Sequence, residues 1–417
     1  MRRIFEEGMN RSEKIYLLSG IIFIGFVMAV FYHYVRGVYF GLPYPYNTFL
    51  FTPLDKFNDF FNMYNITKNL NPYFEEYFIK SNYFPFANVV FFLFTLLPNR
   101  YSFALFTSIF VLIFILINYV NIKTENRIKT LFSVFIFSFL TFPFLFLIDR
   151  GNIEGFLFIL LYFFLYLKDR KPVVSSILLA FAIALKVYPA VFLVLLLSEK
   201  KFKEIIISVS GVLVTTFVSL LFHKGGFMEN IQFIKSGFGI NDSIYFANGN
   251  NYLLSGVSLF SPLKMALYYL GVTVFPIIKT FDGLLPMYSF GVLLLFGLLV
   301  IYVLFIEKQV WKKTAVLVFV MLLFPHVSFD YKLINIFLPL LLYINSGQRS
   351  GRDLFYVPAF ALLLIPKAYY IFTSFISNSG THDINIGVIL NPLIMLSMLL
   401  LIIADGLKDA MDKRKAG

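Results

Sequence analysis

Charged side chains stand at the junctions between long apolar runs, where they could take part in chemistry. In "PLDKFNDFFNMYN", Asp55 and Asp59 are four residues apart and share one face if the segment is helical. A carboxylate at this place could accept a proton as a general base. The alternative is that both residues belong to the solvated face of an amphipathic surface helix.

A second polar group lies in "LIDRGNIEGFLF", between two apolar runs. It crowds Asp149, Arg150, Asn152 and Glu154 into one junction. One interpretation is that these groups line a cavity, where Arg150 is suited to grip phosphate or sugar hydroxyls. The other is a self-paired cluster that caps the two neighbouring helices.

Lys186 is the only charged residue between Pro172 and Ser198. A lysine at bilayer depth costs roughly 2.5–3.5 kcal/mol on insertion scales, so it needs a partner or a wet cavity. Snorkelling of the side chain to the interface is one explanation. The other is a point charge that awaits an anion from outside. Pro189 favours a break in the chain directly after Lys186.

The fourth polar group is in "LFPHVSFDYKLINIF", where His326, Asp330 and Lys332 stand at another junction. These side chains could bind substrate, or Asp330 and Lys332 could form a fixed internal ion pair.

The composition places these junctions in a membrane. Hydrophobic residues make up 59% of the chain and charged residues only 14%, whereas a soluble domain averages about 25% charged. Continuous apolar runs predict an all-α, polytopic helical membrane protein, and they disfavour a β-barrel, whose strands alternate. The net charge of +12 does not indicate nucleic acid, because the basic residues cluster in short loops. The absence of cysteine excludes disulfide and thiol chemistry.

The basic loops predict the topology. Seven short stretches hold 22 of the 35 Lys and Arg residues, and the positive-inside rule puts them, with both termini, in the cytoplasm. They are 1–14, 121–129, 168–171, 199–203, 307–313, 346–352 and 405–417. About twelve crossings follow, within a single membrane domain 1–417, at 15–35, 101–120, 130–148, 155–167, 172–186, 188–198, 204–222, 286–306, 313–325, 332–345, 354–372 and 387–404.

Two long segments face outward in this topology. The loop 36–100 carries Asp55 and Asp59, and its apolar end, 84–98, is typical of an interfacial helix. The second outer loop is 223–285, whose apolar stretch 262–278 we expect to stay outside. Several crossings are shorter than the ~20 residues that a full span needs. Their outer connections are therefore expected to lie below the membrane surface, in a cavity lined by protein.

Several stretches together resemble the GT-C superfamily of integral-membrane glycosyltransferases, and glycosyltransferase family 87 in particular. They are "NDFFNMYNITKNLNPY", "YFPFANVVFFLFTLLP", "DRGNIEGFLFILLYFFLYL", "SSILLAFAIALKVYPAVFLVLLL" and "NGNNYLLSGV". The resemblance covers roughly residues 15–345. It implies a GT-C-type fold in a bacterial cytoplasmic (inner) membrane, with an active site that faces the periplasm or the exterior.

The resemblance also implies a chemistry. The donor would be a sugar on a polyprenyl phosphate, and the acceptor a cell-envelope glycan or glycolipid. Asp59 matches the family's loop carboxylate and would activate the acceptor hydroxyl, with inversion at the anomeric carbon. Lys186 and Arg150 would bind the donor phosphate, and no metal or other cofactor is required. The remaining substrate-binding candidates are Asp55, Asp149, Asn152, Glu154, Asn250, Asn251, His326, Asp330 and Lys332.

A different class of protein stays open, namely an O-antigen polymerase or a flippase-like handler of lipid-linked oligosaccharides. A flippase should carry ionisable residues through its cavity to both sides, whereas here they concentrate at the outer junctions. A polymerase would rely more on outward arginines, and the topology leaves only Arg36, Arg100 and Arg150 outside.

The topology can be tested with reporter fusions. Reporters placed after Lys68 and Asn250 are expected outside, and those after Lys129 and Lys313 inside. Alkaline phosphatase and green fluorescent protein, which are active on opposite sides, provide the measurement. A cytoplasmic signal at Lys68 would remove Asp59 from the compartment that the chemistry needs.

Overall fold

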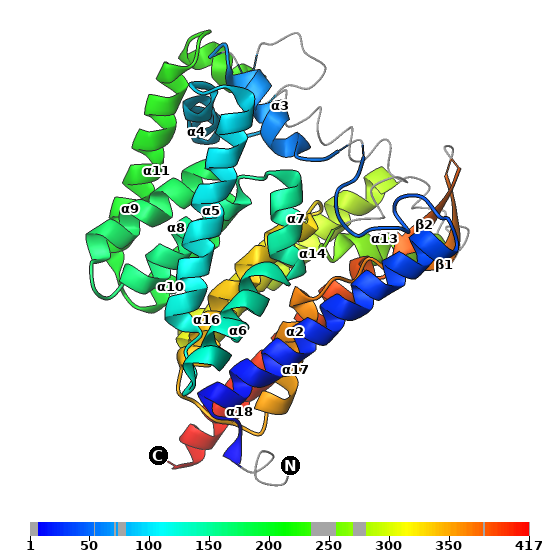
Figure 1. The fold of residues 1–417 in the computed structure, drawn as a ribbon. Coiled ribbons are helices and arrows are strands. Elements are labelled where there is room, and N and C mark those ends of the chain that lie inside the picture. Colours follow the sequence, from blue (N-terminus) through cyan, green and yellow to red (C-terminus); the bar gives the residue numbers. More distant parts are fainter. Residues whose placement is uncertain are drawn as a thin grey trace. The chain divides into compact units, whose positions relative to one another are not determined.

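The computed structural model describes residues 7–53, 55–70, 72–73, 81–234, 256–269, 281–377 and 380–416. Most of them are helical (Figure 1). The packing of the chain divides it into two compact units. The central unit comprises Asp55–Phe114 and Leu147–Asn248, and the terminal unit comprises Met1–Leu54, Ile115–Phe146 and Gly249–Gly417.

The central unit is a set of short helices around two longer ones. Its elements are α3 (Asn58–Thr67), α4 (Pro85–Thr95), most of α5 (Asn99–Asn121), the end of α7 (Phe142–Arg150), α8 (Glu154–Leu167), α9 (Pro172–Leu185), the 3₁₀ turn η2 (Tyr188–Phe192), α10 (Leu193–Ser198) and α11 (Phe202–Phe222). Helix α9 packs against both α8 and α11 (Figure 1).

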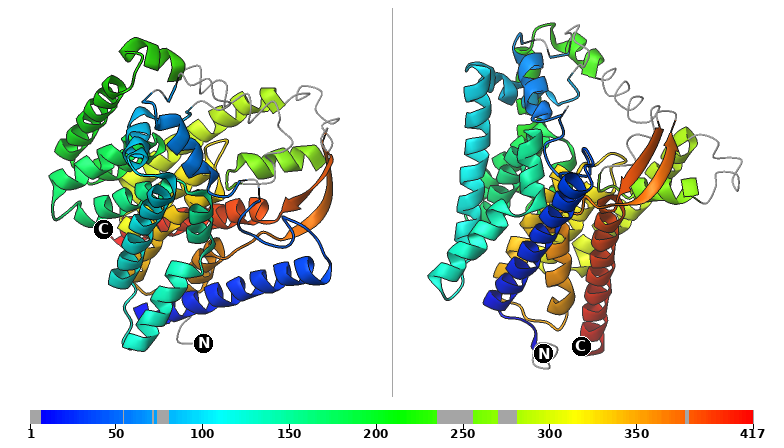
Figure 2. Two further views of the ribbon diagram at one scale, coloured as in Figure 1. Left: turned by 45° about the horizontal axis from the view of Figure 1, so that its top comes forward. Right: turned by 45° about the vertical axis from the view of Figure 1, so that its right-hand side comes forward.

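The terminal unit holds both ends of the chain. Its elements are α2 (Arg11–Tyr34), η1 (Val35–Tyr39), α6 (Arg127–Phe139), α13 (Phe260–Tyr269), α14 (Phe281–Ile301), η6 (Tyr302–Ile306), α15 (Val310–Leu323), η7 (Asp330–Ile336), α16 (Phe337–Asn345), α17 (Asp353–Leu364), β1 (Tyr370–Ser377), β2 (Gly380–Asn385) and α18 (Gly387–Ala416). Helix α17 contacts both α2 and α18 (Figure 2).

The predicted helical architecture is confirmed, since every one of the twelve apolar stretches contains a helix. Among the described residues, five helices are long and apolar enough to cross a membrane. They become six if α6 and α7, which are bent by 44° at a short break, count as one span. The other stretches form helices of 6 to 14 residues, and twelve full crossings therefore stay a prediction.

One predicted span is shorter than expected. Helix α17 ends at Leu364, although the sequence predicts a crossing over 354–372. Pro366 disfavours helical backbone at the residue before it, and Ile365 is extended, with ψ 153°. The antiparallel strands β1 and β2 follow. The hairpin that they form was not predicted, because a run of apolar aromatic residues fits a buried helix and a strand equally well.

The terminal unit is locked by a buried acidic residue at the start of α17. The Asp353 carboxylate accepts hydrogen bonds from the backbone N–H of Met9 at 2.8 Å and from the Tyr343 hydroxyl at 2.5 Å. It also forms an ion pair with Lys14 at 3.3 Å, and both side chains are only 2% exposed. These contacts fasten the N-terminal segment and α2 to the C-terminal third of the chain.

Removing this carboxylate should destabilise the fold. In Asp353→Asn the Lys14 ammonium stays buried but loses its counter-charge, which costs about 3–5 kcal/mol of unfolding free energy. Thermal unfolding in detergent measures the effect. The double variant Lys14→Met/Asp353→Leu removes both charges and should be less destabilised. Equal losses in the two variants would show that the unpaired Lys14 charge is not what destabilises Asp353→Asn.

Candidate active site in the central unit

Helix α3 is held in place by one aromatic side chain next to Asp59. Phe60 is fully buried, and its ring lies 6.2 Å from Phe91 of α4 and 4.9 Å from Phe106 of α5. Aromatic contacts of this kind add to the stabilisation from burial. Phe60 therefore fixes the first turn of α3, and with it the position of the Asp59 carboxylate.

A glycine allows the second polar junction to approach α3. The chain leaves α7 at Gly151, whose φ of +63° suits glycine far better than other residues. A Cβ at this position would lie 2.7 Å from Cβ of Phe60, closer than two carbon atoms can pack. The absence of a side chain at Gly151 thus lets Arg150 and Asn152 reach Asp59.

Two acidic residues share the Arg150 guanidinium. Nη2 of Arg150 lies 2.7 Å from Oδ1 of Asp59, and Nη1 pairs with the Asp55 carboxylate. Asp55 lies before α3, which begins at Asn58, so the two carboxylates do not share a helix face. Arg150 holds them together instead.

The side-chain amide of Asn152 links three separate segments. Its Nδ2 donates to Oδ2 of Asp59 at 2.7 Å and to the Tyr83 hydroxyl at 3.3 Å. Its Oδ1 accepts from Nζ of Lys186 at 3.2 Å and from the backbone N–H of Glu154 at 3.0 Å. An asparagine side chain has two N–H donors and two acceptor lone pairs, so all four positions are used.

Lys186 lies at the predicted break. Helix α9 ends at Leu185, Lys186 is extended, and η2 begins at Tyr188. The Lys186 ammonium forms an ion pair with Oε2 of Glu154 at 2.8 Å; its side chain is 13% exposed and that of Glu154 is fully buried. The Tyr188 hydroxyl contacts the same carboxylate oxygen. Lys186 thus has an internal partner, and its edge is accessible.

Burial dominates the ionisation of Asp59. It raises the pKa of this carboxyl to about 6, against the hydrogen bond from Asn152 and the charge of Lys186, which both lower the pKa. Arg150, 2.7 Å away, also favours the ionised form. A carboxylate with a pKa just below neutrality is mostly ionised at pH 7 and is still basic enough to accept a proton.

The structure brings together only part of the predicted set. Asp55, Asp59, Arg150, Asn152, Glu154 and Lys186 form one connected network. Asp149 is buried beside it, and its backbone carbonyl accepts from the N–H of Phe57. Tyr83 and Tyr188 belong to the network but were not predicted. The signal in the sequence that could have indicated Tyr188 is its place directly before Pro189, at the predicted break in the chain.

Three other predicted residues, His326, Asp330 and Lys332, lie in the terminal unit. Asp330 and Lys332 are buried in η7, His326 is half-buried before it, and Asn391 of α18 donates to Asp330 at 3.4 Å. Lys367, which sequence analysis missed, donates to the carbonyl of Ile365 at 2.9 Å and adds its charge near Asp330. Asn250 and Asn251 lie outside the described residues. The substrate-binding roles of these residues stay predictions.

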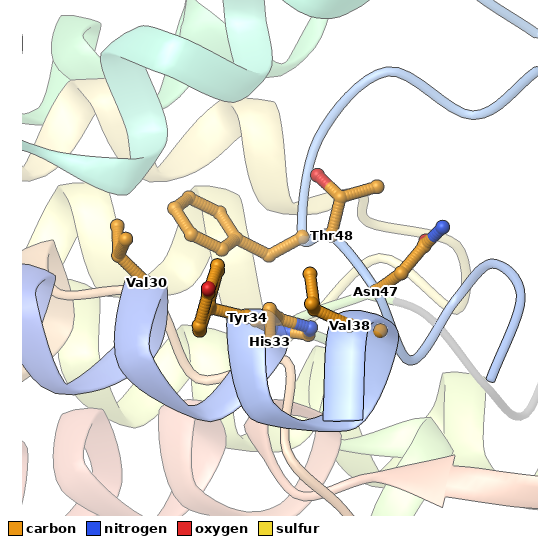
Figure 3. A pocket seen from close by; sticks show the side chains of 8 residues that line it. Val30, His33, Tyr34, Val38, Asn47 and Thr48 are labelled. Carbon is orange, nitrogen blue, oxygen red and sulfur yellow. The ribbon is translucent and has the colours of Figure 1, made fainter. Parts of the chain in front are cut away.

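A cavity of about 480 Å³ lies in the terminal unit (Figure 3). Its walls are the end of α2, η1 and residues 47–49. Val30, Val38 and Phe49 make it largely apolar, and His33 in its wall is tied through Nδ1 to the carbonyl of Tyr46 at 2.8 Å. The described residues that line this cavity include no carboxylate, and the candidate carboxylate base is Asp59 in the central unit.

Comparison with known proteins identifies the family. The model of glycosyltransferase family 87 matches residues 82–327, which is more than half of the chain. The match includes Arg150, Asn152, Glu154 and Lys186, whereas Asp59 precedes it. Searches of curated proteins and of solved structures gave no match. The chain belongs to glycosyltransferase family 87, a family of GT-C-type membrane glycosyltransferases.

Proposed function

We propose that this glycosyltransferase transfers a sugar from a polyprenyl-phosphate donor to a hydroxyl of a cell-envelope glycan or glycolipid. The reaction would take place on the outer face of a bacterial cytoplasmic membrane. The observation that carries the proposal is the Asn152 amide, which contacts a candidate base, Asp59, at one end and a candidate phosphate ligand, Lys186, at the other. A proton acceptor and a cation for the leaving group are thus parts of one site.

In the proposed reaction, an Asp59 carboxylate oxygen takes the proton from the acceptor hydroxyl. The acceptor oxygen forms a bond to the anomeric carbon from one side, and the bond from that carbon to the phosphate oxygen breaks on the other. The electron pair leaves with polyprenyl phosphate, and the configuration at the anomeric carbon is inverted. Lys186 stabilises the negative charge that grows on the phosphate. Asp59 can still bind an acceptor, because an ionised carboxylate has about four acceptor positions.

Arg150 takes a different part in this scheme from Lys186. Its guanidinium contacts Asp55 and Asp59, so it supports the base directly. Asp55, at 40% side-chain exposure against 18% for Asp59, is the better solvated of the two carboxylates. Contact of Arg150 with the donor phosphate stays a prediction.

The base assignment is tested by Asp59→Asn, which keeps the size of the side chain and removes the proton acceptor. Transfer of labelled sugar should fall by about 10²-fold or more with folding intact, and Asp55→Asn should lose less. In the unaltered enzyme, activity should fall about tenfold for each pH unit below about 6, since protonation removes the base. An essential Asp55 with a dispensable Asp59 would show that the base is misassigned.

The role of Asn152 is tested by replacing its side-chain amide with the corresponding carboxylate. Asn152→Asp replaces the Nδ2–H donor that faces Asp59 with a second negative charge, which raises the pKa of Asp59. The pH at which activity is half-maximal should therefore move above about 6, and it should move further than in Asn152→Ala, which only removes the hydrogen bond. The pH profile of transfer gives both midpoints. Identical midpoints in all three proteins would mean that Asn152 does not act on the base.

A further inference from the structure

Two hydrogen-bond donors from one short segment, an ammonium and a hydroxyl, contact the same buried carboxylate oxygen. Lys186 and Tyr188 both contact Oε2 of Glu154, at the point where the chain turns from α9 into η2. Glu154 itself is fully buried at the start of α8. A carboxylate removed from water is strongly unfavourable unless a charge partner compensates it, so Glu154 depends on Lys186 when the site is empty.

In the proposed function, the Glu154 carboxylate and the lipid phosphate both interact with the Lys186 ammonium. The proposed function assigns Lys186 to the phosphate of the lipid, yet the ammonium already has a counter-ion within 2.8 Å. A lipid phosphate that approaches the exposed edge of Lys186 therefore meets a charge that Glu154 has largely neutralised. Glu154 cannot move to water, because its side chain has no exposed surface, and so it keeps its hold on Lys186.

The charge of the lipid changes during the reaction. A polyprenyl-phosphate sugar is a phosphodiester with one negative charge. The polyprenyl phosphate that leaves is a monoester with a charge of about −1.5 to −2 near neutral pH. An unopposed lysine would therefore bind the product more tightly than the donor. That difference favours bond breaking, but it also slows product release, which limits the turnover of many enzymes.

We propose, on the basis of the proposed function, that Glu154 competes with the lipid phosphate for Lys186 and so promotes release of polyprenyl phosphate. Glu154 touches neither the sugar nor the acceptor in this scheme, and is a positioning residue that acts through Lys186. Tyr188 weakens the attraction between Glu154 and Lys186, because its hydroxyl donates a hydrogen bond to the same carboxylate oxygen.

The test is Glu154→Gln, with geranylgeranyl phosphate as the probe of product binding to the full-length protein in detergent. Gln keeps the size of the side chain and removes its charge. The probe should bind about fivefold more tightly, or more, because an ion pair with a fully buried member exceeds the roughly fivefold upper end of exposed pairs. The KM for the polyprenyl-phosphate donor and kcat should fall together, because the retained product leaves more slowly.

A matched control is Glu199→Gln. Glu199 forms an ion pair with the buried Lys168 at 2.6 Å, also within the central unit, but it is not part of the Asp59 network. This variant should change thermal stability without changing probe affinity, KM or kcat. Tyr188→Phe provides an independent check that keeps both charges. Tyr188→Phe should weaken probe binding, whereas Glu154→Gln should strengthen it. Without the Tyr188 hydroxyl, the Glu154 carboxylate interacts more strongly with Lys186 and competes better with the phosphate.

The outcomes separate this inference from the proposed function. Weaker or unchanged probe binding in Glu154→Gln would overturn the competition, and if Glu154→Gln does not fold, unchanged or tighter binding in Tyr188→Phe would do the same. Lys186→Met decides the other question. Lost probe binding in Lys186→Met leaves the phosphate site standing whatever Glu154→Gln shows, whereas unchanged binding would overturn both proposals.

Discussion

The candidate site depends on the side-chain amide of Asn152, whose hydrogen-bonding positions are all occupied. Asn152 has four hydrogen-bonding positions, and its partners come from α3, from the segment before α4, from α8 and from the end of α9. A buried amide that satisfies every position costs little, but any displaced partner would leave a polar atom without compensation. The network therefore has one low-energy arrangement, and the elements around it have to be compatible with that arrangement.

The sequence predicted the helices well because long apolar runs leave few alternatives in a membrane. It also predicted the break after Lys186, since Pro189 and a lone charge point to the same place. It failed after Leu364, where Pro366 separates a helix from a hairpin and apolar content alone cannot distinguish the two. Whether the short helices cross the bilayer is a question of depth, which composition does not determine.

The site was predictable as a set of residues but not as a set of pairs. Local junctions placed Arg150, Asn152 and Glu154 together, because they are neighbours in the chain. The pairing of Arg150 with Asp59 joins residues 91 positions apart, and no periodicity reports such a contact. Lys186 was expected to await an anion from outside, whereas the structure gives it Glu154. The folded chain thus shows an internal ion pair, which is neither snorkelling nor a charge without a partner.

The length of α9 affects the depth at which Lys186 can lie in a membrane. Its 14 residues rise about 21 Å, while the hydrocarbon core of a bilayer is about 30 Å thick. Upright in a membrane, the end of α9 that precedes Lys186 therefore stops short of the headgroup layer on one side. The last turn of the helix, Ala182 to Leu185, is buried among other protein side chains, so protein covers the helix end there. A short helix enclosed in this way brings extended backbone and a charged side chain to membrane depth without exposing either to hydrocarbon.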